Sequence, residues 1–146
     1  MRELSTYARH TVESLRLEAH PEGGYFRRTW TAGRSVVLER GERALASAIY
    51  FLLDRGQTAA WHVVASDELW TWHGPGELAI YLGGQGEHPD EDAEPVTLGP
   101  SRGRFHLLVP AGTWQKSVAV SEACLSTCVV SPEFRFDDWC LVTDSK

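Results

Sequence analysis

Short runs of aliphatic, aromatic and β-branched residues, interrupted at regular intervals by glycine or proline, fill the chain from about residue 25 onwards. Two of the clearest interruptions are Gly74-Pro75-Gly76 and Pro110-Ala111-Gly112. Such punctuation is typical of an all-β sandwich or barrel. Because no helical period separates the runs, a parallel sheet with crossover helices is not expected. The predicted strands cover residues 25–31, 45–53, 58–64, 68–73, 77–82, 105–109, 113–117 and 123–130.

The first twenty residues follow a different pattern. Apolar or weakly polar side chains recur at a helical spacing between residues 5 and 17, and Ser5 can cap the start of that helix. Pro21 and the pair Gly23-Gly24 then favour a tight turn. We therefore expect a single domain of 146 residues, in which residues 1–20 form a helix and lead-in and residues 21–141 form a β-barrel.

Composition and charge exclude several classes of partner. Hydrophobic residues make up 42% of the chain and charged residues 23%, which is typical of a globular protein. The formal net charge of −6 argues against a surface for nucleic acid or anionic membrane, and part of that charge falls in an expected surface loop at residues 85–95. No apolar stretch is long enough to cross a bilayer, and residues 1–4 lack the apolar core of a secretion signal. The expected location is the cytoplasm.

Strand periodicity places several functional side chains on one wall. Side chains on a strand alternate between its two faces, so residues of equal parity lie on the same side. His62 therefore faces the same side as Glu68, Trp70 and Trp72, if a short hairpin connection separates the two strands. Gln115 can join them from a later segment. An imidazole, a carboxylate and an amide would then point into an apolar, tryptophan-lined hollow, which is the arrangement of a small-molecule site.

The segment from Gly56 to Glu68 resembles the first conserved motif of the cupin superfamily. That motif has a glycine, a His-x-His pair and a glutamate at fixed spacing. Gly56, His62 and Glu68 fit the spacing, while Val64 stands where the second histidine is expected.

A second segment resembles the other cupin motif, which has Pro-x-Gly followed by a histidine. Here Pro110 and Gly112 fit, and Gln115 takes the histidine position. The combination is similar to a small branch of uncharacterised single-domain cupins, often described as predicted sugar epimerases. The stretches that carry this resemblance are residues 20–27, 48–53, 66–70 and 109–115. It implies an all-β double-stranded β-helix, or jelly-roll barrel, with a short N-terminal helix, and it implies a homodimer.

The leading functional hypothesis is an epimerase or isomerase that binds a small polar or sugar-like molecule. A histidine titrates near neutrality, so His62 could remove a proton alpha to a carbonyl, with Glu68 as its catalytic partner. Gln115 would anchor the substrate, and Arg27 would hold an anionic group through its planar guanidinium. The other residues expected to contact substrate are Glu22 at the rim, Tyr25 or Tyr50 as a proton donor, and Trp70 and Trp72 as stacking surfaces.

Two alternatives remain open from the sequence. A typical metal-binding cupin offers three imidazoles and a carboxylate, a donor set suited to divalent transition metals. Here His62, Glu68 and Gln115 would be the ligands of such an ion in an oxygenase or lyase, and no other cofactor is indicated. The second alternative is a non-catalytic module that binds a small molecule. In that case His62 and Glu68 would only hydrogen-bond each other inside the barrel.

Overall fold

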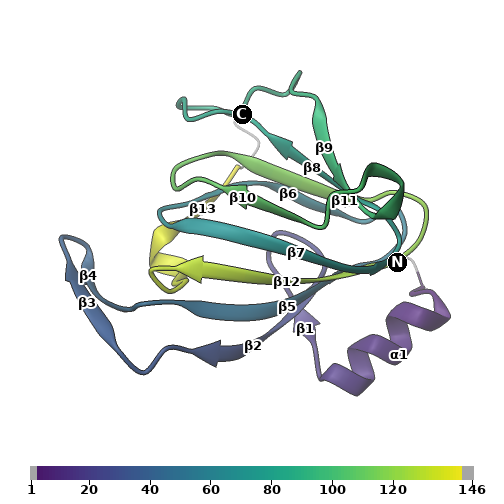
Figure 1. Cartoon of the computed structure of the whole chain (residues 1–146), viewed down its shortest axis with the longest axis horizontal. Coiled ribbons are helices and arrows are strands. Elements are labelled where there is room, and N and C mark those ends of the chain that lie inside the picture. Colours follow the sequence, from purple (N-terminus) through teal and green to yellow (C-terminus); the bar gives the residue numbers. More distant parts are fainter. Residues whose placement is uncertain (1–2, 143–146) are drawn as a thin grey trace.

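The N-terminal helix is capped as the sequence predicts. In the computed structural model, which describes residues 3–142, helix α1 spans Thr6–Leu15 and the Ser5 hydroxyl accepts a hydrogen bond from the Ala8 N–H. Ser5 also donates its N–H and its hydroxyl to the Asp54 carboxylate, at 2.7 Å each. The helix is therefore tied at its first turn to the end of a barrel strand, and it packs on the outer face of the larger sheet (Figure 1).

Two antiparallel sheets form the barrel. The larger sheet has the order β1-β2-β5-β12-β7-β10, and the smaller one has the order β13-β6-β11-β8-β9. The bounds in the larger sheet are β1 Glu18–Ala19, β2 Tyr25–Thr31, β5 Ser47–Leu53, β7 Asp67–Pro75, β10 His106–Val109 and β12 Cys124–Ser131. Those in the smaller sheet are β6 Thr58–Val64, β8 Leu78–Leu82, β9 Pro95–Leu98, β11 Gln115–Ala119 and β13 Trp139–Leu141. The predicted all-β architecture with one short N-terminal helix is confirmed.

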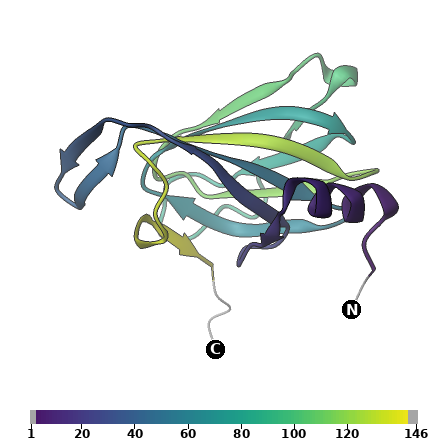
Figure 2. The ribbon, with the colours of Figure 1, turned by 90° about the horizontal axis from the view of Figure 1, so that it is seen from below.

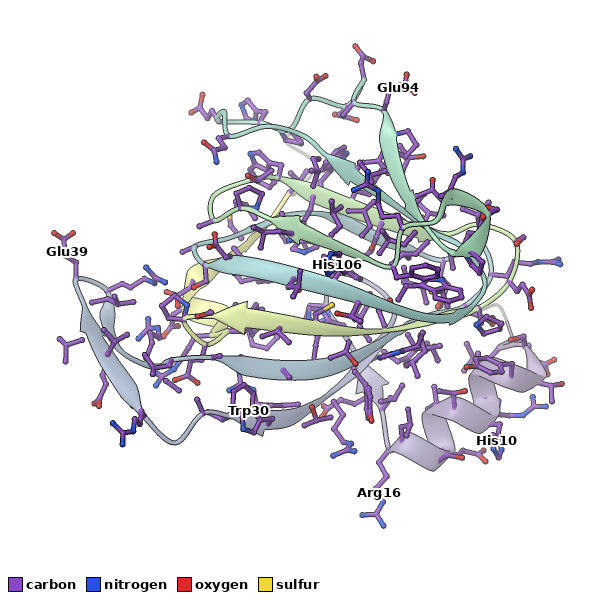
Figure 3. All side chains as sticks on the ribbon, in the orientation of Figure 1. His10, Arg16, Trp30, Glu39, Glu94 and His106 are labelled. Carbon is purple, nitrogen blue, oxygen red and sulfur yellow. The ribbon has the colours of Figure 1, made fainter. Side chains whose placement is uncertain are left out.

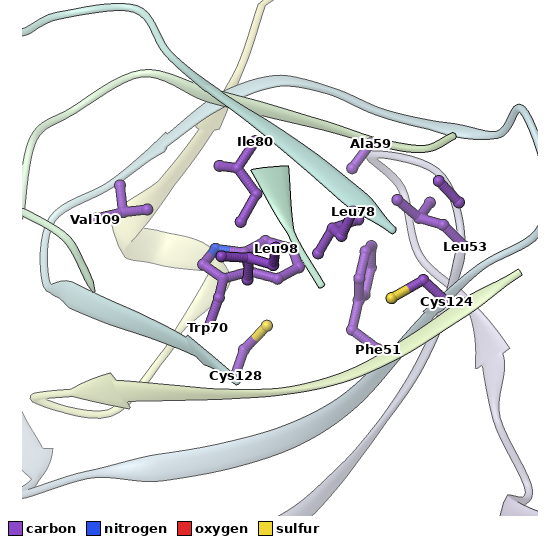
Figure 4. Close-up of a cluster of buried hydrophobic side chains, with 11 residues drawn as sticks. Phe51, Leu53, Ala59, Trp70, Leu78, Ile80, Leu98, Val109, Cys124 and Cys128 are labelled. Carbon is purple, nitrogen blue, oxygen red and sulfur yellow. The ribbon is translucent and has the colours of Figure 1, made fainter. Parts of the chain in front are cut away.

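A hydrophobic core fills one part of the space between the sheets. Trp70 and Phe51 meet edge to face, with ring centroids 5.6 Å apart, and both are almost fully buried (Figure 4). Leu78, Ile80 and Leu98 from the smaller sheet close over them. This packed part leaves the remainder of the interior, toward the C-terminal segment, for the cavity described below.

The structure adds elements that the sequence pattern did not indicate. A hairpin of β3 (Ser35–Leu38) and β4 (Gly41–Ala44) extends from the barrel at the end away from α1 (Figures 1 and 2), with Glu39 at its tip (Figure 3). Two short 3-10 turns span Pro100–Arg102 and Phe136–Asp138. Strands β1, β9 and β13 were also missed; β9 begins at Pro95, the last residue of the expected loop. These strands have four residues or fewer, too short for a periodic signal.

Two ion pairs fix the chain after β12. Arg43 of the hairpin donates to both carboxylate oxygens of Asp138, at 2.8 and 3.0 Å. Glu133 accepts hydrogen bonds from the Ala44 N–H at 2.6 Å and from Arg28 at 3.0 Å. The segment from Glu133 to Trp139 is thus held against the open side of the barrel. No helix among the described residues has the length and apolar character needed to span a membrane.

Replacing Leu98 by alanine tests whether β9 belongs to the core. Leu98 is fully buried, so the truncation should lower the free energy of unfolding by about 2 to 5 kcal/mol through lost transfer energy and the cavity left behind. Val37→Ala in the projecting hairpin is the control, because Val37 is 80% exposed. Urea denaturation measures both, and equal small losses would show that β9 does not cover the core.

Candidate functional site

A cavity of about 310 Å³ opens at one side of the barrel. Its walls come from β2, β5, β6, β7 and β12 and from the segment Glu133 to Trp139. Its volume lies within the range of small-molecule sites. The buried titratable groups His20, Glu22, His62 and Glu68 are among its lining residues, and its exposed lining residues are Arg28, Arg135 and Phe136.

His62 lies in the cavity wall as a neutral imidazole. It is 2% exposed and lies opposite Gln115 in the pairing of β6 with β11. Its Nδ1 is 2.8 Å from the Ala60 carbonyl oxygen, and a carbonyl can only accept, so this contact assigns the proton to Nδ1. The lone pair is then on Nε2. Burial lowers the pKa of His62, an effect that the nearby Glu68 opposes. His62 therefore has a free basic nitrogen at neutral pH.

Glu22 is placed beside His62 by a glycine turn. A Cβ on Gly23 would lie 2.3 Å from the Thr58 carbonyl oxygen, and Gly23 has a φ of +115°, so this close approach requires glycine. The Glu22 carbonyl accepts the Ala60 N–H at 2.8 Å, which attaches the turn to β6. As a result Glu22 Oε1 lies 3.4 Å from His62 Nε2.

The surroundings of Glu22 favour its protonated form. Trp139 Nε1 donates to Oε1 at 3.1 Å, while the Nδ1 of His20, which accepts the Glu22 N–H, lies 3.6 Å from the same oxygen. An ionised Oε1 would therefore face two ring lone pairs. Burial raises the pKa of Glu22 to about 8 against the opposing Trp139 hydrogen bond, and burial together with His62 lowers the pKa of His20 to about 4. At neutral pH the site holds a carboxylic acid next to a neutral imidazole.

Glu68 is held from behind by an amide. Trp70 Nε1 can only donate, and it donates to Gln115 Oε1 at 2.9 Å. This orients the Gln115 amide so that its Nε2 donates to Glu68 Oε1 at 2.8 Å. Burial raises the pKa of Glu68, and the proximity of His62 opposes that rise. The amide therefore acts as a support for Glu68.

The expected cupin metal ligands do not fit a metal ion here. The Gln115 oxygen is engaged by Trp70 and its NH₂ group faces Glu68, so the amide presents a donor where a ligand would need a lone pair. Val64 offers no ligand atom. Among residues 3–142, no group of three or more His, Cys, Asp or Glu side chains is arranged to hold a metal. We therefore assign no chemical step to a metal.

The structure brings together five of the predicted site residues. His62, Glu68, Trp70 and Glu22 line the cavity, with Glu22 beside His62 and deep in the site where the sequence suggested only the rim. Gln115 is 1% exposed and lies behind Glu68.

Four predicted substrate contacts lie outside the cavity. Tyr25 and Tyr50 pack with α1 on the outer face, and Arg27 donates its Nε to the Leu15 carbonyl of that helix. Trp72 packs on the core and donates to the Gly76 carbonyl. The parity of β2 explains the first three, because Phe26 and Arg28 face inward there and Arg27 pairs with Tyr50 on the other face.

Sequence reasoning missed several cavity residues. His20 directly precedes the predicted turn at Pro21 and Gly23-Gly24, and a histidine two residues before Glu22 was a usable signal. Arg28 differs from the predicted Arg27 by one residue of strand parity. Trp139 and Arg135 come from the irregular chain after β12, for which strand periodicity gives no information.

A family model described as the cupin superfamily (DUF985) matches residues 9–142, which is most of the chain. The chain belongs to this cupin family. A structure of a Shewanella oneidensis protein shares 31% identity with a TM-score of 0.80, over 97% of this chain and 86% of that one. A hypothetical protein from Leishmania major shares 26% identity with a TM-score of 0.82, over 93% and 87% of the two chains.

A more distant structure shares only the fold. KdgF from a Halomonas species is 17% identical with a TM-score of 0.58, over 83% of this chain and 88% of that one. Among curated proteins, none matches the sequence significantly.

The raised pKa of Glu22 predicts a pH dependence of stability. The unfolded carboxyl has a pKa of 4.5 and the folded one a pKa of about 8, so between these values the folded state binds more protons and its stability falls as pH rises. Relative to Glu22→Gln, the wild type should lose roughly 1 kcal/mol per pH unit across this window, since one proton corresponds to about 1.4 kcal/mol per unit.

Urea denaturation of both proteins from about pH 5 to 8 measures this difference. The pKa shifts of His20 and His62 affect the stability of both proteins to a similar extent, so their contributions largely cancel in the comparison. Parallel stability curves for the two proteins would show that Glu22 has an ordinary pKa.

Proposed function

We propose that this cupin binds a small polar carbonyl compound and isomerises or epimerises it by proton transfer, with His62 as the base and Glu22 as the acid. The observation that carries the proposal is the 3.4 Å separation of His62 Nε2 and Glu22 Oε1 inside the cavity. A buried imidazole with a free lone pair beside a protonated carboxyl is a matched pair for general acid–base catalysis.

The first half of the proposed reaction has two proton transfers. His62 Nε2 removes a proton from the carbon alpha to the carbonyl, and Glu22 donates its proton to the carbonyl oxygen, which gives a neutral enol. In the second half Glu22 takes back a hydroxyl proton as a carbon is protonated. A water molecule on the opposite face protonates the same carbon to give an epimer, and the resulting hydroxide takes the proton from His62. With an α-hydroxyl on the substrate the intermediate is an enediol, and return of the His62 proton to the former carbonyl carbon gives an isomer. The sugar-like substrates suggested by the resemblance to predicted epimerases are one class with such acidic C–H bonds.

Glu68 has a supporting role in this scheme. When His62 becomes an imidazolium, it needs a nearby negative charge, because an unpaired buried cation is costly. Glu68 acts electrostatically on His62 in the direction that favours the cation. Gln115 and Trp70 keep the Glu68 carboxyl in place for that purpose. The amide is thus a positioning residue.

Hydrogen exchange with heavy water tests the proposal. A panel of keto sugars and oxo acids is incubated with the protein, and NMR measures deuterium incorporation alpha to the carbonyl. Loss of one general acid or base typically costs about 10²- to 10⁴-fold in rate. Glu22→Gln should fall in this range, and His62→Gln should abolish enzyme-dependent exchange.

The matched control is His73→Gln. His73 lies on an exposed part of β7, where its Nε2 is 2.7 Å from the Thr127 hydroxyl, and it is outside the cavity. This variant should retain full exchange. Exchange that persists in His62→Gln would contradict the assignment of the base. Ligands that bind the wild type without any exchange would instead identify a non-catalytic binding module.

A further inference from the structure

We infer that the cavity selects an organic anion with a planar apolar body, held by Arg135 at the mouth while its carbonyl end reaches the His62–Glu22 pair. The inference rests on the proposed function for the carbonyl end and on a separate set of residues for the anion and the body. It differs from the sugar-like class, because the middle of the cavity has few polar partners to offer.

The polar groups of the cavity lie at its two ends. The buried end carries His20, Glu22, His62 and Glu68, whereas Arg28, Arg135 and Phe136 are exposed and so mark the mouth. The wall between them is largely apolar, with the side chains Phe26, Ile49, Phe51, Val64, Trp70 and Val130. A buried hydroxyl without a hydrogen-bond partner weakens binding. A ring bearing many hydroxyls therefore fits this wall less well than a planar apolar body.

The mouth carries a surplus positive charge. Glu133 is the acidic residue there, and it is already paired with Arg28 at 3.0 Å and with the Ala44 N–H at 2.6 Å. Among residues 3–142, Arg135 has a single long ion pair, 4.0 Å to Glu133, and its side chain is 49% exposed. The guanidinium is thus available to a ligand. A cationic mouth stands out in a chain whose formal net charge is −6.

The chemistry of the guanidinium selects the anion. Its planar array of N–H groups binds carboxylate or phosphate oxygens through paired hydrogen bonds. Of the two carboxyls at the buried end, Glu22 keeps its proton up to a pKa of about 8 through burial, so it adds no charge there that repels such a ligand. A carboxylate and a phosphate ester share this recognition, and the experiment below separates them.

Binding of 4-acetylbenzoate tests the inference, because this probe has a carboxylate, a flat ring and a ketone in line. Isothermal titration compares it with uncharged 4-acetylbenzamide and with 4-acetylphenyl phosphate. The wild type should bind one of the two anions at least about tenfold more tightly than the amide, as expected for a charge-assisted hydrogen bond. Whichever anion binds more tightly identifies the preferred group.

Two arginine variants provide the matched comparison. Arg135→Gln should remove the preference for the anion and leave binding of the amide unchanged, and Arg135→Lys should retain part of the preference. Arg27→Gln is the control, since Arg27 lies on the outer face of β2, away from the cavity. It should behave as the wild type. Thermal melting verifies that each variant is folded.

Several results would overturn the inference. Equal affinity for the anions and the amide would show that the cavity has no anion site. A preference for the anion that survives in Arg135→Gln would show that Arg135 does not form that site. Tighter binding of glucuronate than of 4-acetylbenzoate would contradict the inference that the ligand has an apolar body. If no probe binds measurably, planar organic anions are rejected as the ligand class. These readouts are binding constants, so they remain interpretable even if His62→Gln shows that the proposed proton transfer does not occur.

Discussion

The backbone of Ala60 in β6 is the constraint on which the site depends. Its N–H donates to the Glu22 carbonyl and its C=O accepts from His62 Nδ1, each at 2.8 Å. One residue therefore fixes both the position of the acid and the tautomer of the base. Because these are main-chain groups of a paired strand, the geometry is set by the sheet and not by flexible side chains. The turn through Gly23 permits this contact, since a side chain there would collide with Thr58.

Burial then determines which partner holds the proton. In water a glutamate would be ionised at neutral pH and a histidine partly protonated, so the pair would be ionic. Taking two charges into an apolar cavity is costly. Burial therefore raises the pKa of Glu22 to about 8 and lowers the pKa of His62, and it is the main cause of both shifts. The neutral pair avoids that cost. Trp139 opposes part of the rise in the Glu22 pKa, because it donates a hydrogen bond to the Glu22 oxygen that faces His62.

The departure from the usual cupin ligand set has a structural consequence. Where a histidine would present a lone pair to a metal, Gln115 presents N–H groups, because Trp70 takes its oxygen. The amide thereby stabilises the Glu68 carboxyl from behind. The position where the cupin resemblance implies a metal ligand thus holds an amide that supports the Glu68 carboxyl. The same barrel accommodates both, because the strands fix the direction of the side chain and not its chemistry.

Strand parity within β6 and β7 was determined by the sequence, and it turned His62, Glu68 and Trp70 toward the same cavity. The single wall expected for them was wrong, because β6 and β7 belong to different sheets and the side chains come from two facing walls. Alternation is a local property of the extended chain, as is the capping of α1 by Ser5, so neither needs information from elsewhere. Only the tertiary structure decided which face of β2 turns inward. Both faces of β2 carry an aromatic residue and an arginine, so the local pattern does not show which face turns inward. Helix α1 packs on the face that bears Arg27, and this leaves Arg28 at the cavity.

The meeting of Glu22, His62 and Trp139 also required the tertiary structure. These residues come from a turn, a central strand and the start of a short edge strand, and Trp139 donates to a residue 117 positions earlier in the chain. Such a contact arises when an entire barrel closes, and no period of two or of 3.6 residues encodes it. The sequence thus determined the fold and the wall on which the base stands. Closure of the barrel brought Glu22 beside His62 and placed Arg135 at the mouth of the cavity.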